Sequence, residues 1–334
     1  MKEIRLAIIG CGGFCRYHVK TIVEKLPQIE VVGLCDIARD HAEKMREEYF
    51  AKSDPPIFLD YRDMLNDVKP QAVHVSTPHT LHFRHAYDSL SAGAHVMVDK
   101  PMVTDSRQAR QLVRKAQAKK KLLSVAVQGI HTDTFAYARK LIEDGTMGPL
   151  QLVTAYFGQN WMKGTVGLWR QDPKLSGGGQ LYDSCYHVNS TMMYLVNSQV
   201  KEVFCWADYK GCKVDINAVV VIKFANGCMA TVTSGGNTAG WKSHLHIQGE
   251  NAMMEISPHG GDFKVYAQKW KEPITAPPPA FVKKNPKVSP IENFAQAIAG
   301  KAKLRCTGHV GILVADLMDA IYASVRSGKP VKVR

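Results

Sequence analysis

The fold of this chain is decided by the stretch Leu6-Ala-Ile-Ile-Gly-Cys-Gly-Gly-Phe-Cys-Arg16, in which an apolar segment runs into a glycine cluster and then a helical pattern. Gly10 permits a tight turn, and Gly12 lets the backbone approach a bound phosphate closely. The free N–H groups at the start of the following helix favour anions. Cys15 stands where a third glycine is usual, but its side chain is small enough for close packing. The stretch therefore predicts the pyrophosphate site of a dinucleotide.

A second apolar segment, Ile29-Glu-Val-Val-Gly-Leu-Cys-Asp36, ends in an acid. Its carboxylate is well placed to accept hydrogen bonds from ribose hydroxyls and to repel the 2′-phosphate of NADP. Arg39 lies close enough along the chain to reach such a phosphate. We therefore expect NAD as the cofactor, with NADP as the alternative.

Apolar segments of strand length alternate with amphipathic helical segments through the first part of the chain. Strands are expected near residues 4–9, 29–35, 71–76, 94–98 and 122–127, and helices near 13–25, 38–50, 80–92 and 104–120. This alternation predicts an α/β architecture: a Rossmann domain over residues 1–127, with helices on both faces of a parallel sheet.

The pattern changes after Gln128. Helices are expected near 132–144, 181–196 and 308–327, strands near 149–160 and within 200–267, a short last strand, and an extended surface loop from Pro273 to Pro290. Consecutive strands predict a C-terminal α+β domain, residues 128–334, with an open and largely antiparallel sheet. The long apolar alternation within 200–267 favours a homodimer or homotetramer, with an intramolecular sandwich as the alternative.

Composition narrows the classes of partner. The 334 residues exceed the usual size of one hydrophobic core. The 43 Lys and Arg outnumber the 30 Asp and Glu, but they are dispersed, and the densest run, Lys115 to Lys121, closes a helix. We expect no nucleic-acid partner, and neither a signal peptide nor an apolar run of membrane-spanning length. Eight cysteines without paired spacing indicate a reducing, cytoplasmic location and no structural metal.

Two further segments should lie near the cofactor, because ligands of open α/β sheets bind beyond the carboxyl ends of the strands. They are Ser76-Thr-Pro-His-Thr-Leu-His82 and Val98-Asp-Lys-Pro101. Lys100 stands between a buried strand and a proline, whose peptide bond permits the cis form. This placement makes Lys100 a candidate site residue.

A third segment is Gly177-Gly-Gly-Gln-Leu-Tyr-Asp-Ser-Cys-Tyr-His187. Asp183 and His187 are four residues apart at an expected helix start and should share one face. A carboxylate beside an imidazole orients it and raises its pKa, which makes His187 a candidate base near neutral pH. An exposed surface pair is the alternative interpretation.

Together these motifs resemble the Gfo/Idh/MocA oxidoreductases, which include glucose–fructose oxidoreductase and inositol dehydrogenases. The resemblance implies NAD(P)-dependent oxidation of sugars or cyclitols, and a C-terminal sheet that often forms a dimer interface. It implies that Lys100, Asp183 and His187 are catalytic and that Trp169-Arg170 lies near the nicotinamide, although such a pair is also common as a surface stack. The chain departs from the family pattern at Cys15, at Asp99 in place of Glu, and at Gln128-Gly-Ile-His131 in place of an Arg-rich tract.

The resulting site predictions fall into two sets. The cofactor set comprises Gly10, Cys11, Gly12, Gly13, Phe14, Asp36, Ile37, Ser76, Thr77, Pro78, His79, His82, Asp99, Lys100, Gln128, Trp169 and Arg170. The substrate set comprises Lys100, His131, Asp183 and His187.

The leading functional hypothesis is a dehydrogenase acting on a hydroxyl of a sugar, sugar derivative or cyclitol. His187 would accept the hydroxyl proton and Lys100 would stabilise the developing charge on oxygen, although the two could exchange roles. Asp183 would orient His187 and bind a neighbouring hydroxyl. The alternatives are a redox-assisted glycosidase or lyase, and a non-catalytic nucleotide-sensing regulator on the same fold.

Overall fold

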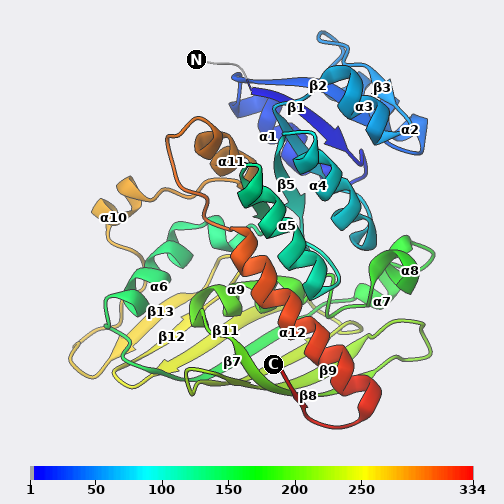
Figure 1. The fold of residues 1–334 in the computed structure, drawn as a ribbon. Coiled ribbons are helices and arrows are strands. Elements are labelled where there is room, and N and C mark those ends of the chain that lie inside the picture. Colours follow the sequence, from blue (N-terminus) through cyan, green and yellow to red (C-terminus); the bar gives the residue numbers. More distant parts are fainter. Residues whose placement is uncertain (1–3, 334) are drawn as a thin grey trace. The chain divides into compact units, whose positions relative to one another are not determined.

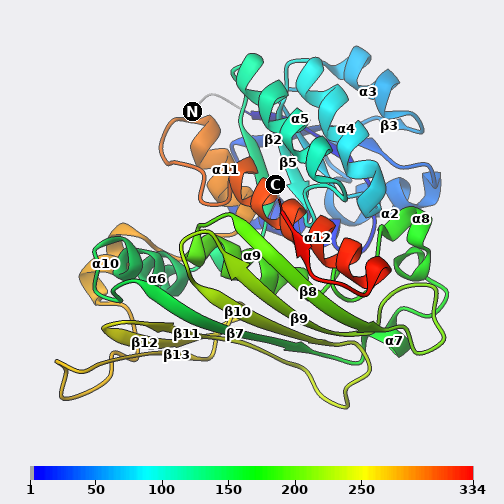
Figure 2. The same ribbon diagram turned by 60° about the horizontal axis from the view of Figure 1, so that its bottom comes forward.

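The computed structural model describes residues 4–333, which form two compact units. The first contains the chain up to Val103 together with Arg107–Ala126 and Val288–His309. The second contains Thr104–Ser106, Val127–Lys287 and the chain from Val310 onward. Figures 1 and 2 show the elements of each unit.

The first unit is a six-stranded parallel sheet in the order β3-β2-β1-β4-β5-β6, as the Rossmann prediction requires. Its strands are β1 (Ile4–Ile9), β2 (Ile29–Cys35), β3 (Ile57–Phe58), β4 (Ala72–Val75), β5 (His95–Asp99) and β6 (Leu123–Ala126). Its helices are α1 (Cys15–Lys25), α2 (Arg39–Tyr49), α3 (Tyr61–Val68), η1 (His79–Leu81), α4 (His82–Ser91), α5 (Ser106–Ala118) and α11 (Pro290–Ile298). The strand order reverses between β1 and β4, and ligands of such sheets bind beyond the carboxyl ends of the strands there.

Helix α11 belongs to the first unit, which corrects the predicted assignment of all residues after 127 to the C-terminal domain. Its Ile291 and Phe294 share one apolar core with Val19 and Ile22 of α1. The helix begins with a capping box, in which Ser289 accepts from the Glu292 N–H and the Glu292 carboxylate accepts from the Ser289 N–H. This apolar face explains why the chain returns to the sheet.

The second unit is built on an eight-stranded sheet in the order β13-β12-β11-β7-β10-β9-β8-β14. Strands β7 and β10 are parallel and the other neighbours are antiparallel. The strands are β7 (Leu150–Gly158), β8 (Val200–Asp208), β9 (Asn217–Phe224), β10 (Met229–Gly235), β11 (Lys242–Gly249), β12 (Ala252–Ile256), β13 (Phe263–Ala267) and β14 (Val331–Lys332). The predicted α+β domain with a largely antiparallel sheet is confirmed.

The helical elements of this unit are η2 (Gly129–His131), α6 (Asp133–Glu143), α7 (Trp161–Gly164), η3 (Trp169–Gln171), α8 (Pro173–Ser176), α9 (Tyr186–Val196), α10 (Pro279–Lys284) and α12 (Gly308–Ser327). Helices α6, α9 and α12 lie on one face of the sheet (Figure 2). The strands alternate accordingly: Val220 and Ile222 are buried, whereas Val219 and Val221 are 44% and 43% exposed. One face of the sheet therefore carries apolar side chains that the described helices of this unit leave exposed.

Two predictions about this part of the chain are wrong. The segment from Pro273 to Pro290 is not wholly an extended loop, because Pro279 and Pro290 occupy first-turn positions of α10 and α11, where a missing N–H costs nothing. Helix α12 also has the length and apolar composition of a membrane span, contrary to expectation. Its most apolar window is 61% buried inside the protein, so packing of α12 accounts for that composition.

Candidate active site

The glycine loop between β1 and α1 has the geometry of a phosphate cradle. Gly10 has a φ of +93°, and a Cβ there would lie 2.5 Å from the Ser76 carbonyl oxygen, so only glycine fits. A Cβ on Gly12 or Gly13 would meet no atom within 4 Å. No side chain caps the first turn of α1. Open space above two glycines, facing uncapped N–H groups, is what a pyrophosphate needs.

Asp36 closes this loop from the end of β2. Its Oδ2 accepts the Cys11 N–H at 2.8 Å and its Oδ1 accepts the Ala38 N–H at 3.0 Å. Each carboxylate oxygen has a second lone pair, so the side chain retains capacity to accept from hydroxyl donors. The neighbouring Ile37 is 91% exposed, an apolar surface beside the predicted ribose position.

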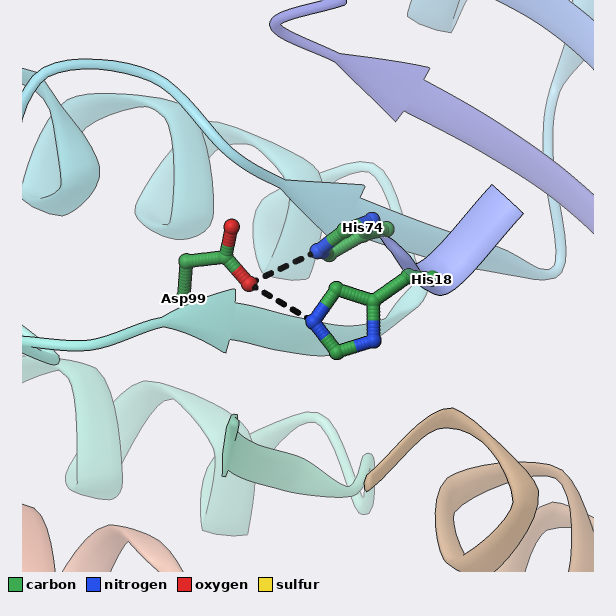
Figure 3. A group of neighbouring side chains, drawn as sticks. All are labelled: His18, His74 and Asp99. Carbon is green, nitrogen blue, oxygen red and sulfur yellow. Dashed lines mark hydrogen bonds and ion pairs between the residues drawn. The ribbon is translucent and has the colours of Figure 1, made fainter. Parts of the chain in front are cut away.

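Asp99 is held by a buried network at the carboxyl ends of β4 and β5 (Figure 3). His74 Nε2 lies 3.0 Å and His18 Nε2 lies 3.3 Å from Asp99 Oδ1, and the Ser76 hydroxyl donates to Oδ2. Burial alone would raise the pKa of Asp99, but interactions with His74 and His18 hold it well below its usual value. The group is therefore a carboxylate at neutral pH.

Lys100 follows Asp99 directly, and the bond to Pro101 is cis, the form that the sequence permits. On the far side of Lys100, the His82 ring connects two backbone carbonyls: Nδ1 lies 2.6 Å from the Pro101 oxygen and Nε2 lies 2.7 Å from the Thr77 oxygen. Burial lowers the pKa of His82 although both contacts favour the charged ring, and a neutral ring has one N–H for the two carbonyls. Both chain neighbours of the candidate lysine are thus fixed by side chains of the first unit.

The glycine run of the second unit has a packing role. A Cβ on Gly179 would lie 1.9 Å from the Asp215 carbonyl oxygen, and one on Gly178 would lie 2.0 Å from the Tyr322 hydroxyl. The buried Asp215 carboxylate accepts from the N–H groups of Gly179 and Leu181 and from the Tyr322 hydroxyl. Burial raises the pKa of Asp215. This buried carboxylate fixes the turn that carries Asp183.

Asp183 lies in that turn and not in a helix, because α9 begins only at Tyr186. Asp183 and His187 therefore do not share a helical face, contrary to the prediction. The Asp183 Oδ2 instead accepts from Trp161 Nε1 at 2.7 Å and from Arg170 Nε at 3.0 Å. The Arg170 guanidinium also lies over the Trp169 ring. The structure thus brings Asp183, Arg170 and Trp169 together.

His187 stands in the first turn of α9, beside a second histidine that the sequence analysis missed. Its ring contacts the His259 ring edge to face, with centroids 4.7 Å apart. His259 Nδ1 lies 2.9 Å from the Ser243 hydroxyl, and its ring also meets Trp241. Trp241 is itself exposed.

Other predicted residues have local roles that are visible in the structure. His131 is fully buried with Nδ1 2.8 Å from the Val127 oxygen, which fits support of the chain better than contact with a substrate. Thr77 Oγ1 contacts His85, and the rings of the buried His79 and His82 lie 5.9 Å apart. Trp161, His18 and His74 were missed, and only His74, a polar residue inside an apolar strand, gave a sequence signal.

Family models match both parts of the chain. The oxidoreductase family with an NAD-binding Rossmann fold matches residues 4–127, and the GFO/IDH/MocA C-terminal domain matches residues 135–255. The chain belongs to the Gfo/Idh/MocA oxidoreductases, as the resemblance of its motifs implied. It is an oxidoreductase whose first unit is an NAD-binding Rossmann domain.

Individual relatives are distant but cover most of the chain. D-glucoside 3-dehydrogenase of Escherichia coli is 24% identical over 99% of this chain and 97% of its own length. Inositol 2-dehydrogenase of Salmonella paratyphi B is 21% identical over 76% of this chain and 74% of its own. The WlbA dehydrogenase of Bordetella pertussis, solved with NADH and UDP-GlcNAcA, has the same fold, with a TM-score of 0.83, 21% identity and coverage of 100% and 98%.

Proposed function

We propose that this protein is an NAD-dependent dehydrogenase that oxidises a hydroxyl group of a sugar, sugar derivative or cyclitol. The observation that carries the proposal is the rigid presentation of Lys100 at the carboxyl end of β5, with both of its chain neighbours anchored. Relatives named for glucosides and inositol support the substrate class.

The residues of the first unit fit the cofactor. The open space above Gly12 and Gly13 would take the pyrophosphate, and Asp36 would accept from the adenosine ribose hydroxyls. The exposed Ile37 would lie against the adenine. We also propose as cofactor contacts Ser76, Thr77, Pro78, His79, His82, Gln128, Trp169 and Arg170. When bound, NAD accepts the hydride that the carbinol carbon releases.

Side chains of the protein would remove the proton of the reacting hydroxyl. A carbinol carbon releases hydride only as its hydroxyl loses a proton, so a base must lie within hydrogen-bond reach of that hydroxyl. We assign His187 as this base, and Lys100 as the cation that donates to the reacting oxygen and stabilises its developing charge. Asp183, whose Oδ2 accepts from Trp161 and Arg170, would orient His187 and bind a substrate hydroxyl next to the reacting one.

We propose that the exposed sheet face forms a homodimer or homotetramer contact. Along this face Trp206 stands beside Val219 in register, and Leu152 stands beside Met229. Trp206 is 67% exposed, and leaving so large an apolar side chain in water is energetically unfavourable. Light scattering at micromolar concentration should report at least twice the 37.0 kDa mass of one chain, and a monomer would refute this assignment. The eight free cysteines support a reducing, cytoplasmic location.

The function is tested with a panel of polyols, aldoses, uronates and glycosides, by following the absorbance of reduced nicotinamide. The proposal predicts NADH formation with at least one hydroxyl substrate. Conversion of a glycoside without net NADH would instead identify a redox-assisted glycosidase or lyase. NADH binding with no conversion of any compound would favour a nucleotide-sensing regulator.

A further inference from the structure

The buried network around Asp99 joins three elements of the first unit. His18 comes from α1, His74 from β4 and Asp99 from the last position of β5, and Figure 3 shows both rings directed at one carboxylate oxygen. Both imidazoles are fully buried and Asp99 is 6% exposed. Three polar side chains in such a place need a reason, because burying them without pairing is costly.

The chemistry of the contacts shows which atoms donate to Asp99. A carboxylate only accepts hydrogen bonds, so His74 must present an N–H at Nε2, and His18 meets the same oxygen with its own Nε2. His74 Nδ1 lies 3.9 Å from the Cys15 thiol. Burial lowers the pKa of His18, which keeps that ring neutral. The carboxylate oxygen is thus approached from two directions by imidazole Nε2 atoms.

Asp99 directly precedes Lys100, so the network around Asp99 affects the position of the lysine. The Asp99 side chain carries the carboxylate only one methylene from the backbone, so any group that holds it also holds the backbone that precedes Lys100. The Ser76 hydroxyl donates to the other carboxylate oxygen, and the His82 ring contacts the Pro101 carbonyl beyond the lysine. We propose that His74 and His18 are positioning residues, which act through Asp99 to fix the direction in which Lys100 leaves the strand.

The network also connects two parts of the proposed active site. Helix α1 carries His18 at the end of its first turn, and the same helix begins directly after the glycine loop. Because His18 meets the carboxylate that precedes Lys100, displacement of α1 would be transmitted to the lysine. The inference rests on the proposed role of Lys100 in catalysis and adds two residues that support it.

A metal ion is the competing explanation, since one ligand atom from each of His18, His74 and Asp99 lies within 4.8 Å of the others. Metal-bound histidines usually donate their second ring nitrogen to a fixed partner. Among the described residues, neither ring nitrogen of His18 has a partner in hydrogen-bond geometry, and its Nε2 approaches Asp99 as an ion-pair contact at 3.3 Å. A carboxylate accepting from imidazoles accounts for the same contacts without an ion, so we favour the hydrogen-bonded network.

The test compares His74→Val, which removes the donor, with His74→Gln, which retains an N–H. His95→Gln is the matched control, because His95 lies at the other end of β5 and accepts from the Leu122 N–H. We expect His74→Val to lower kcat about ten- to a hundredfold, since small misplacements of catalytic groups have effects of this order. KM and the Kd of NADH should change little, His74→Gln should recover part of kcat, and His95→Gln should match the parent.

A second readout needs no substrate. The rate of Lys100 acetylation by acetic anhydride, measured by peptide mass spectrometry, reports the environment of its amine directly. His74→Val should change this rate and His95→Gln should not. If no compound in the panel is converted, the proposed function fails, while this readout still decides whether His74 positions the lysine. Unchanged kcat or unchanged Lys100 reactivity in a folded His74→Val protein would overturn the proposal.

Two measurements on the parent protein remain decisive if His74→Val does not fold. Imidazole nitrogen NMR should show both His18 and His74 protonated at Nε2, and a His74 ring without a proton on Nε2 would contradict the network. Elemental analysis of the purified protein should find no stoichiometric transition metal. A metal that is present in the parent and lost in His74→Gln would identify a metal centre and overturn the positioning role.

Discussion

Substitution of Gly12 by valine separates cofactor binding from folding. The space around Gly12 is open, since a Cβ would meet nothing within 4 Å, so the change should alter the free energy of unfolding by no more than about 0.5 kcal/mol. The branched side chain would occupy the space that we assign to the pyrophosphate. We expect the Kd of NADH to rise at least about tenfold, a loss of about 1.4 kcal/mol in binding free energy.

Gly10→Ala is the matched comparison, because it should lower the stability of the fold. An L-residue in the left-handed region costs about 1–2 kcal/mol, and the added Cβ would also meet the Ser76 carbonyl oxygen at 2.5 Å. Tm should therefore fall by several degrees. Thermal unfolding and NADH fluorescence titration measure both quantities for each variant. If Gly12→Val bound NADH as tightly as the parent, or lost as much stability as Gly10→Ala, the phosphate cradle would be misassigned.

Two further predictions concern cofactor choice and thiol chemistry. NAD should bind more tightly than NADP, because the Asp36 carboxylate repels a 2′-phosphate by an energy of order 1–4 kcal/mol at about 4 Å. Asp36→Asn should bring the Kd values of the two cofactors closer together. Tighter binding of NADP than of NAD by the parent would refute this prediction. Iodoacetamide at pH 8 should label Cys212 first, since it is the one cysteine that is not buried. Burial raises the pKa of Cys185 to about 12 and keeps that thiol protonated. Rapid labelling of several thiols would contradict the burial of the other cysteines.

The architecture of the first unit was readable from the sequence because parallel strands buried on both faces appear as continuous apolar runs. The glycine loop and Asp36 were found for a related reason, since their roles depend on local backbone geometry. Helix α11 was missed although Ser289 and Glu292 form a capping box, because the surrounding prolines suggested a loop. The return of α11 to the first unit depends on long-range packing that no local pattern records.

The site was predicted less completely than the fold. Asp183 was singled out from its spacing to His187, but its partners Trp161 and Arg170 come from separate turns that only the tertiary structure brings to it. His259 reaches His187 from the loop after β12, with no sequence relation to it. Contacts of this kind depend on loop paths, which apolar periodicity does not specify.

The central claim is that Lys100 and His187 carry the chemistry while other residues hold the cofactor. Its most direct test is turnover of Lys100→Met and His187→Ala on a substrate identified by the panel, with NADH affinity measured on the same preparations. We expect each variant to lose at least about a hundredfold in kcat, as when a proton-transfer group or an oxyanion donor is removed, with a Kd for NADH close to that of the parent. Near-normal turnover by Lys100→Met would contradict the account and favour a regulatory, nucleotide-sensing role.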